Sequence, residues 1–132
     1  GKFGFQLKIG CPKKYMPNKQ ILKWADKNKV NLLLTQKPKE AAKNADCIMT
    51  DKWVSMNDKV NKKMKKKALK IFQVNKNLMK VAKSDAIFMH CLPVGRGEEV
   101  TDEIIDGEKS VVWKQALNRV HAQKSIINWC LS

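Results

Sequence analysis

A thiol follows directly after the apolar run 86–89, in the segment His90-Cys91-Leu92-Pro93. An apolar, β-rich run of this length predicts a buried strand, and the proline after it predicts a loop. Because ligands of open α/β sheets bind at the carboxyl ends of strands, this loop is a candidate functional site. A loop thiol near cations can be partly thiolate, so Cys91 is the first candidate catalytic residue. The alternative is an inert buried cysteine, which is the commoner role of a free thiol.

A second candidate set follows another apolar run. Asp51 comes directly after the run 46–50, and Ser55 and Met56 follow it closely. A carboxylate at the end of a strand can hold an ammonium group, and a nearby hydroxyl supplies a second polar anchor. The alternative is that Asp51 or Ser55 caps the lysine-rich helix expected after them. Since both candidate sets follow strands, we expect Asp51 and Cys91 at the same edge of one sheet.

Arginine is rare in this chain: of the 27 basic residues only Arg96 and Arg119 are arginine. The planar fork of arginine suits a carbonyl, a carboxylate or a phosphate, so both residues are candidates for ligand binding. The alternative for both is an ordinary salt bridge with the acidic residues in segment 98–102. His90 and His121 are weaker candidates, because a histidine at a strand end or on a helix is more often structural.

The candidate residues are carried by alternating strand-like and helix-like segments. Apolar runs predict strands over residues 5–9, 30–35, 46–50, 86–89 and 110–113. Helical patterns follow at residues 17–25, 38–44, 58–69, 74–82 and 118–131. Strand–helix alternation with short connections predicts an α/β fold, in which helices cover both faces of a parallel sheet. We interpret the chain as one domain, because no linker or repeat interrupts it.

The net charge of +15 raises the question of nucleic-acid binding. Proteins that read bases rely on arginine and on interleaved aromatic side chains, whereas this chain spreads lysines along its whole length. The densest cluster is Lys59, Lys62, Lys63, Lys65, Lys66 and Lys67. We interpret this cluster as the solvated side of a helix, and we keep a basic domain that binds nucleic acid as an alternative.

The cysteines give no sign of a metal site or of disulfides. Cys11, Cys47, Cys91 and Cys130 are far apart, and the chain has only two histidines. Metal-ligand spacing is therefore absent, and we expect neither metal nor other cofactor. Reduced thiols favour the cytoplasm. Because no run of about 18 apolar residues occurs, neither a membrane span nor a signal peptide is predicted.

Together these motifs resemble the ornithine-binding domain of an ornithine carbamoyltransferase. The strongest match is Asp85 to Pro93, continued by Arg96 to Glu103, and nearly the whole chain lines up. The resemblance implies a Rossmann-like parallel sheet without its first strand, because residues 1–4 resemble the end of that domain's first helix. Residues 1–132 would then be an ornithine-binding domain alone. The carbamoyl-phosphate-binding domain, with its Ser-x-Arg-Thr-Arg and His-Pro-x-Gln motifs, is absent from this sequence.

In this family the δ-amine of L-ornithine attacks carbamoyl phosphate, which gives L-citrulline and phosphate. The resemblance implies that one set of residues holds the amino-acid end of ornithine: Asp51, Ser55 and Met56. It implies that a second set contacts the carbamoyl group or the attacking amine: Cys91, the Leu92 carbonyl and Arg119. Full enzymes of this kind are usually homotrimers with active sites near subunit interfaces, and they need no metal. The chain alone is therefore expected to have little or no turnover.

Three positions depart from the family pattern. Asn57 stands where glycine is usual, Leu117 where glutamate is usual, and Gly95 where a larger residue is common. Val94, which follows Pro93, resembles the acetylornithine type of the family. Two further interpretations therefore stay open. The enzyme could carbamoylate another amine, such as N-acetylornithine or putrescine, or the chain could be a degenerate domain with a structural role only.

Overall fold

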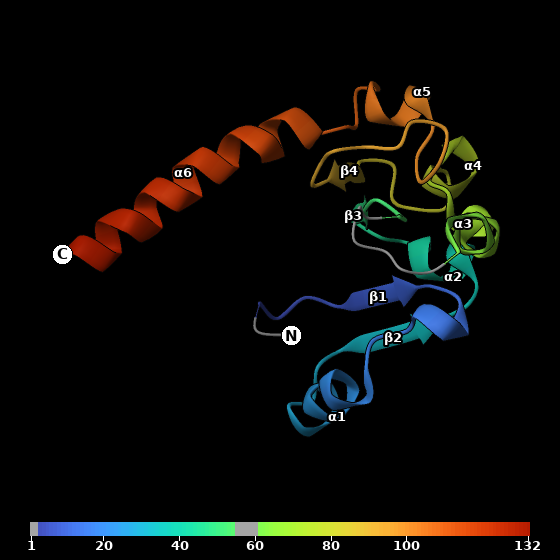
Figure 1. Ribbon diagram of the computed structural model, residues 1–132, viewed down its shortest axis with the longest axis horizontal. Helices are drawn as coiled ribbons and strands as arrows, with labels where there is room; N and C mark the ends of the chain where they lie inside the picture. Colours follow the sequence, from blue (N-terminus) through green and yellow to red (C-terminus); the bar gives the residue numbers. More distant parts are fainter. Residues whose placement is uncertain (1–2, 55–60) are drawn as a thin grey trace.

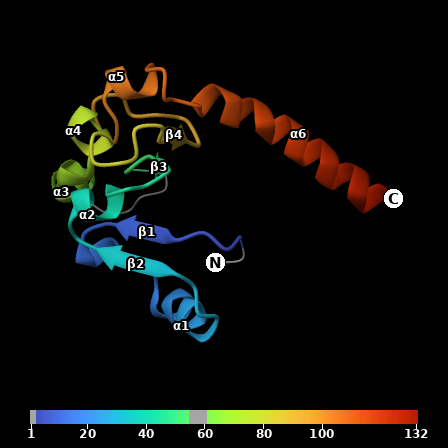
Figure 2. The same ribbon diagram turned by 180° about the vertical axis from the view of Figure 1, so that it is seen from behind.

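The computed structural model describes residues 3–54 and 61–132. In chain order the elements are β1 (Leu7–Gly10), η1 (Lys13–Tyr15), α1 (Lys19–Lys27), β2 (Leu32–Thr35), α2 (Pro38–Ala42), β3 (Cys47–Thr50), α3 (Lys62–Leu69), η2 (Lys70–Phe72), α4 (Lys76–Met79), β4 (Ile87–His90), α5 (Asp102–Ile105) and α6 (Val112–Leu131). Strands and helices alternate as the sequence predicts, so the α/β class is confirmed. Figures 1 and 2 show the arrangement from opposite sides.

The strands pair in parallel, as predicted, but they form two sheets. β1 pairs with β2 in a register that matches Leu7 with Leu32, and β3 pairs with β4 in a register that matches Thr50 with His90. The pairs follow one another in the order β2, β1, β3, β4 (Figure 1). In the described parts of the chain no strand ladder joins β1 to β3, so the expected single sheet is not continuous.

Asparagine side chains begin three of the helices. Asn18 Oδ1 accepts the Ile21 N–H of α1 at 2.9 Å, and Asn75 Oδ1 accepts the Leu78 N–H of α4 at 3.1 Å. Asn61 caps α3 in the same way. These bonds satisfy N–H groups that have no partner inside a helix, which explains why each helix begins where it does.

The main core lies around β4 and supports the segment that carries the thiol. Phe88 of β4 is fully buried together with Val100, Ile105 and Val112. Side chains of α2, β3 and α4 pack against them: Ala42, Ile48, Leu78 and Met79. A smaller cluster of Trp53, Val54 and Leu69 lies beside it. The end of β4 is therefore fixed on a packed support.

The predicted strand at 110–113 is wrong. Ser110 makes only an isolated bridge with Phe88, and α6 begins at Val112. Val112 is fully buried, so the apolar character of this run reflects the burial of a helix start. A short apolar run cannot distinguish that arrangement from a strand. The helix predicted from residue 118 thus begins earlier, and the short helix α5 was not predicted.

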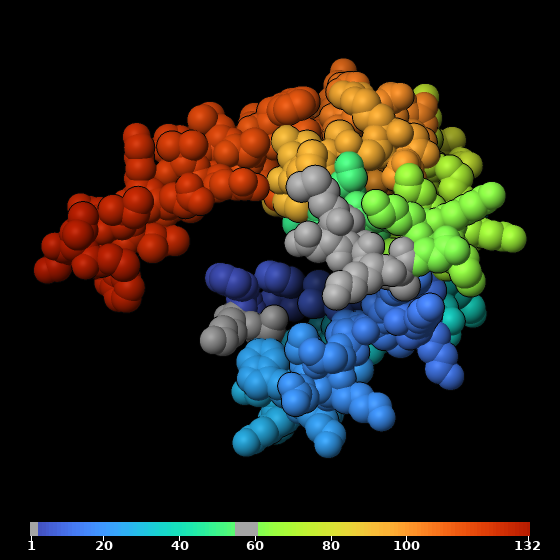
Figure 3. Space-filling model, in the orientation of Figure 1, coloured from blue at the N-terminus to red at the C-terminus, as the bar shows by residue number. Residues whose placement is uncertain are grey.

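Helix α6 extends away from the rest of the molecule (Figures 1 and 2). A space-filling view shows an open recess between this helix and the segments around β1 and α1 (Figure 3). Large apolar side chains along α6 are exposed: Trp113, Leu117, Val120, Ile126, Ile127, Trp129 and Leu131. In residues 3–54 and 61–132, no helix combines the length and apolar character needed to cross a bilayer.

Candidate functional site

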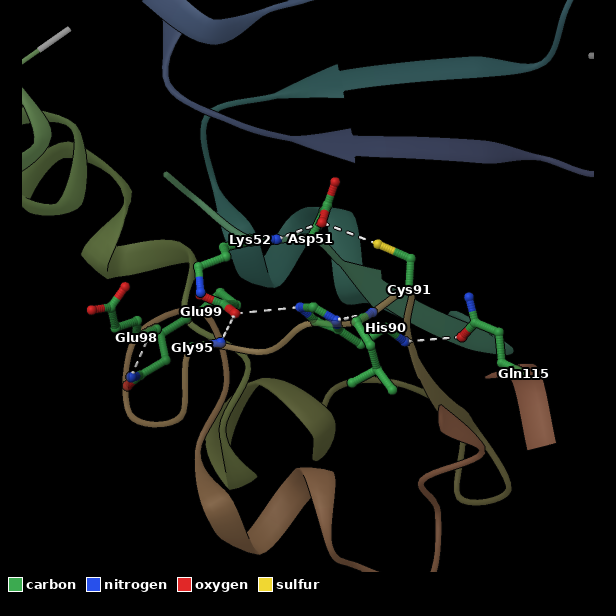
Figure 4. Close-up of polar contacts among 10 residues, drawn as sticks. Asp51, Lys52, His90, Cys91, Gly95, Glu98, Glu99 and Gln115 are labelled. Carbon is green, nitrogen blue, oxygen red and sulfur yellow. Dashed lines mark hydrogen bonds and ion pairs between the residues drawn. The ribbon is translucent and has the colours of Figure 1, made fainter. Parts of the chain in front are cut away.

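The parallel register of β3 and β4 brings a carboxylate and a thiol together. Because Thr50 lies opposite His90, the residues that follow, Asp51 and Cys91, leave the sheet side by side. Cys91 Sγ donates a hydrogen bond to Asp51 Oδ1 at 3.1 Å, and the same oxygen accepts the Lys52 N–H at 2.6 Å (Figure 4). Two residues that are 40 positions apart thus meet at one strand edge.

A guanidinium completes this group from the opposite end of the chain. Arg119 of α6 donates through Nη2 to the Cys91 carbonyl oxygen at 3.2 Å. Arg119 also lines an open cavity of about 510 Å³ together with Cys91, Leu92, Pro93 and Ala116. Cavities of several hundred Å³ are typical of sites for small molecules. Asp51, Cys91 and Arg119, which the sequence predicted as site residues, therefore lie together, while their roles stay predictions.

The surroundings of Cys91 raise the pKa of its thiol. The hydrogen bond to Asp51 raises the pKa of Cys91, with further contributions from burial and from the charge of Asp51, and Arg119 opposes them. The same hydrogen bond lowers the pKa of Asp51, although partial burial opposes this shift. This direction is opposite to the partly ionised thiol that the sequence led us to expect, because the largest influence on the pKa of Cys91 is its hydrogen bond to a carboxylate. The raised pKa favours the protonated form of Cys91, whose S–H donates to Asp51.

This arrangement predicts how Cys91 reacts with an alkylating reagent. Asp51→Asn removes the negative charge beside Sγ, so the pKa of Cys91 should fall and its thiolate fraction at pH 8 should rise. We expect faster iodoacetamide labelling of Cys91 in this variant, measured peptide by peptide by mass spectrometry across a pH series. Asp46→Asn is the matched control, because Asp46 pairs with Lys83 at 2.5 Å and does not contact Cys91. Equal labelling rates in the two variants would contradict the assigned hydrogen bond.

The structure adds Gln115 to the site, a residue that the sequence analysis missed. Gln115 Oε1 accepts the backbone N–H of His90 at 3.1 Å (Figure 4). Gln115 precedes Arg119 by four residues on α6, so both side chains lie on the helix face that meets the end of β4. This spacing would have indicated Gln115, but the predicted strand at 110–113 placed it outside the helix.

The remaining candidates lie elsewhere or outside the described residues. Arg96 pairs with Asp102 at 2.7 Å and with Asp106 at 2.5 Å, so the salt-bridge alternative is correct for this arginine. His121 is exposed on α6. Ser55, Met56 and Asn57 fall among the residues that the structure does not describe.

The lysine cluster and the cysteines can be placed in part. Lys62, Lys63 and Lys67 are exposed on α3, and Lys66 pairs with Glu98. Cys11, Cys47, Cys91 and Cys130 are free thiols. Within the described ranges, no three histidine, cysteine, aspartate or glutamate side chains gather as metal ligands would.

Comparison with known proteins identifies the family. Residues 1–130 match the family described as "Aspartate/ornithine carbamoyltransferase, Asp/Orn binding domain". The chain belongs to this family. Its sequence is 50% identical over 130 residues to the ornithine carbamoyltransferase of Nitrobacter winogradskyi, and 48% identical over 130 residues to that of Brucella abortus. The resemblance found in the sequence is thereby confirmed.

Solved structures give the same result for the fold. The ornithine carbamoyltransferase of Pyrococcus furiosus superposes with a TM-score of 0.86 at 45% identity, covering 96% of this chain and 42% of that chain. The anabolic ornithine carbamoyltransferase of Campylobacter jejuni gives a TM-score of 0.86 at 35% identity, covering 96% and 43%. The Nitrobacter match covers 98% of this chain and 42% of the relative. This Asp/Orn-binding domain thus spans less than half the length of the enzymes that it matches.

Proposed function

We propose that this domain is the ornithine-binding half of an ornithine carbamoyltransferase, which converts carbamoyl phosphate and L-ornithine into L-citrulline and phosphate. The observation that carries the proposal is that Cys91 contacts both Asp51 and Arg119, beside a cavity that Cys91 and Arg119 line. The reaction is inferred from the family to which the chain belongs. The three side chains provide the charges and hydrogen bonds that this reaction needs.

The reaction forms one bond and breaks another. The neutral δ-amine of ornithine attacks the carbamoyl carbon, the carbon–oxygen bond to phosphate breaks, and phosphate leaves with the bonding electrons. The attacking nitrogen then loses a proton to phosphate or solvent. Holding the two reactants in contact supplies much of the rate enhancement, because it removes the entropic cost of their encounter. The remaining requirement is to stabilise the negative charge on the carbamoyl oxygen in the tetrahedral intermediate.

Each proposed site residue has a part in this reaction. Asp51, with its lowered pKa, is ionised at neutral pH and holds the α-ammonium group of ornithine. The Cys91 thiol and the Leu92 carbonyl contact the attacking amine, which needs polar partners when it is neutral. The Arg119 guanidinium stabilises the developing oxyanion. Ser55 and Met56 are proposed to complete the pocket for the amino-acid end of the substrate.

We propose further that this domain works with a carbamoyl-phosphate-binding domain. The phosphate-binding motifs of the family are absent from residues 1–132. The relatives are more than twice as long as the matched region, and the exposed apolar side chains of α6 offer a surface for a second domain. A homotrimeric assembly also stays a proposal, based on the resemblance.

The gap between the two sheets supports a Rossmann-like arrangement. The order β2, β1, β3, β4 leaves a place between β1 and β3, which is where the central first strand of a doubly wound sheet belongs. We propose that a strand from a segment outside these 132 residues enters there. It would pair with both open edges and join the two sheets into one.

An assay of citrulline formation tests the proposed function. The protein to use is the full-length polypeptide that carries this domain together with its carbamoyl-phosphate-binding domain, here named the complete enzyme. We expect turnover with ornithine and at least about 100-fold lower kcat/KM with N-acetylornithine, whose acylated α-nitrogen cannot pair with Asp51. The 132-residue domain alone should form no citrulline. Preference for N-acetylornithine or putrescine would reassign the substrate, and an inactive complete enzyme would indicate a degenerate domain.

A further inference from the structure

We infer that the buried pair His90 and Glu99 holds the thiol loop in its working conformation, and that both are positioning residues. This inference rests on the proposed function, because it concerns how Cys91 and the Leu92 carbonyl are presented to the substrate. Both side chains are fully buried, at 0% exposure, directly behind the loop 91–95. Figure 4 shows His90 next to Cys91 in the chain, with its ring directed toward Glu99.

The histidine ring fixes the backbone of the loop. Leu92 has a φ of 58°, a left-handed conformation that non-glycine residues rarely adopt without support from their surroundings. The Leu92 N–H donates to His90 Nδ1 at 2.9 Å, and this bond supplies such support. Arg119 then binds the Cys91 carbonyl on the other side of the same loop. The loop is thus held between a buried imidazole and a guanidinium.

The tautomer of His90 follows from this contact. Because Nδ1 accepts a hydrogen bond, the proton of the neutral ring is on Nε2. Nε2 lies 3.3 Å from Glu99 Oε1, although the two groups are not aligned as a hydrogen bond. Cys91 Sγ donates instead to Asp51. The ring therefore faces the Leu92 amide and Glu99, so the geometry favours a positioning role over proton transfer to or from the thiol.

The glutamate closes the far end of the loop. Glu99 Oε1 accepts the backbone N–H of Gly95, so one carboxylate meets both the ring that begins the loop and the residue that ends it. A Cβ atom on residue 95 would lie 2.7 Å from Glu99 Oε2, which is too close for an undisturbed contact. Gly95 thus makes room for the carboxylate. Glycine therefore stands at position 95, where a larger residue is common in the family, at the point where the Glu99 carboxyl group comes close to the backbone.

Two substitutions of His90 separate positioning from simple stabilisation. In His90→Asn the amide oxygen can take the place of Nδ1 and keep the bond to the Leu92 N–H. In His90→Gln the amide lies near the place of Nε2, so contact with Glu99 is kept and the Leu92 bond is lost. Both replace a buried ring with a smaller amide, so both should lower the melting temperature to a similar extent. We expect kcat of the complete enzyme to fall about 100-fold in His90→Gln and much less in His90→Asn.

The readouts are kcat and KM for ornithine, the melting temperature, and the rate of Cys91 alkylation. Faster alkylation in His90→Gln than in His90→Asn is expected, because the released loop frees the thiol from Asp51. His121→Asn is the matched control at an exposed histidine and should change none of these quantities. Equal losses of kcat in the two His90 variants at equal melting temperatures would overturn the inference, as would wild-type kcat in both.

A third variant covers the case in which His90→Gln does not fold. Glu99→Gln keeps the shape of the side chain and an oxygen for the Gly95 N–H, and it replaces the carboxyl group that faces Nε2 with an amide. We expect a lower kcat with little change in KM for ornithine, and faster alkylation of Cys91. Unchanged kcat and unchanged alkylation would reject the inference. A complete wild-type enzyme that forms no citrulline would instead refute the proposed function, while the alkylation rates would still test the loop.

Discussion

Replacing Arg119 with alanine in the complete enzyme is expected to lower kcat by about 10²–10³-fold, the usual cost of losing one donor to an oxyanion. Arg119 lines the cavity and reaches the thiol loop, so its guanidinium can stabilise charge that develops on the carbamoyl oxygen. KM for ornithine should change little, because this interaction strengthens only in the transition state. Arg119→Lys keeps the charge without the planar fork, so it should recover only part of the rate.

Steady-state kinetics of citrulline formation measure this effect. Arg96→Ala is the matched control, because Arg96 is occupied by Asp102 and Asp106 and does not line the cavity. Its kcat should stay close to the wild-type value even if its stability falls. A wild-type kcat in Arg119→Ala would show that another group binds the carbamoyl oxygen.

Replacing Asp51 with asparagine should lower kcat/KM for ornithine by about 10- to 100-fold, which corresponds to losing one hydrogen bond to a charged group. The loss should fall mainly on KM, because the ammonium group that Asp51 holds does not react. Asp46→Asn is again the control, since it removes an exposed carboxylate from the same strand region. Unchanged KM for ornithine in Asp51→Asn would remove Asp51 from the binding site.

The pH dependence of this step follows from the shifted pKa of Asp51. Its hydrogen bond with Cys91 lowers that pKa below the ordinary value for aspartate, so the carboxylate stays ionised throughout the neutral range. Binding that depends on Asp51 is therefore complete above the ordinary aspartate pKa and is lost only as the pH falls through the lowered value. The kcat/KM profile should show no loss attributable to Asp51 between pH 6 and pH 8.

The proximity of Asp51 and Cys91 could be predicted from the sequence, because both residues directly follow strands. Asp51 and Cys91 each follow an apolar run, and parallel strands place their carboxyl ends at one edge, so their proximity required only the correct strands. Arg119 is different. Val112 is the only residue of its helix that is buried, so the contact of Arg119 with the Cys91 carbonyl depends on how α6 begins at Val112.

Two predictions failed for the same reason: the strand at 110–113 and the partly ionised Cys91. Both depend on burial and on neighbouring charges, which the sequence composition does not show. The run 110–113 is apolar because Val112 enters the core as the first residue of a helix, and a strand looks alike in the sequence. A loop thiol near cations suggested a partly ionised Cys91, but the hydrogen bond to the Asp51 carboxylate at 3.1 Å raises the pKa of the thiol more than Arg119 lowers it. The division into two sheets was also not predicted. Whether β1 pairs with β3 depends on how the two segments meet in the fold, which neither segment shows by itself.

A crystal structure of the complete enzyme with bound L-ornithine tests the account most directly. We expect the α-ammonium group within hydrogen-bonding distance of the Asp51 carboxylate, and the δ-amine beside the Cys91 thiol and the Leu92 carbonyl, facing the cavity that Arg119 lines. Ornithine bound away from these three residues, or bound with its δ-amine turned from the thiol loop, would contradict it.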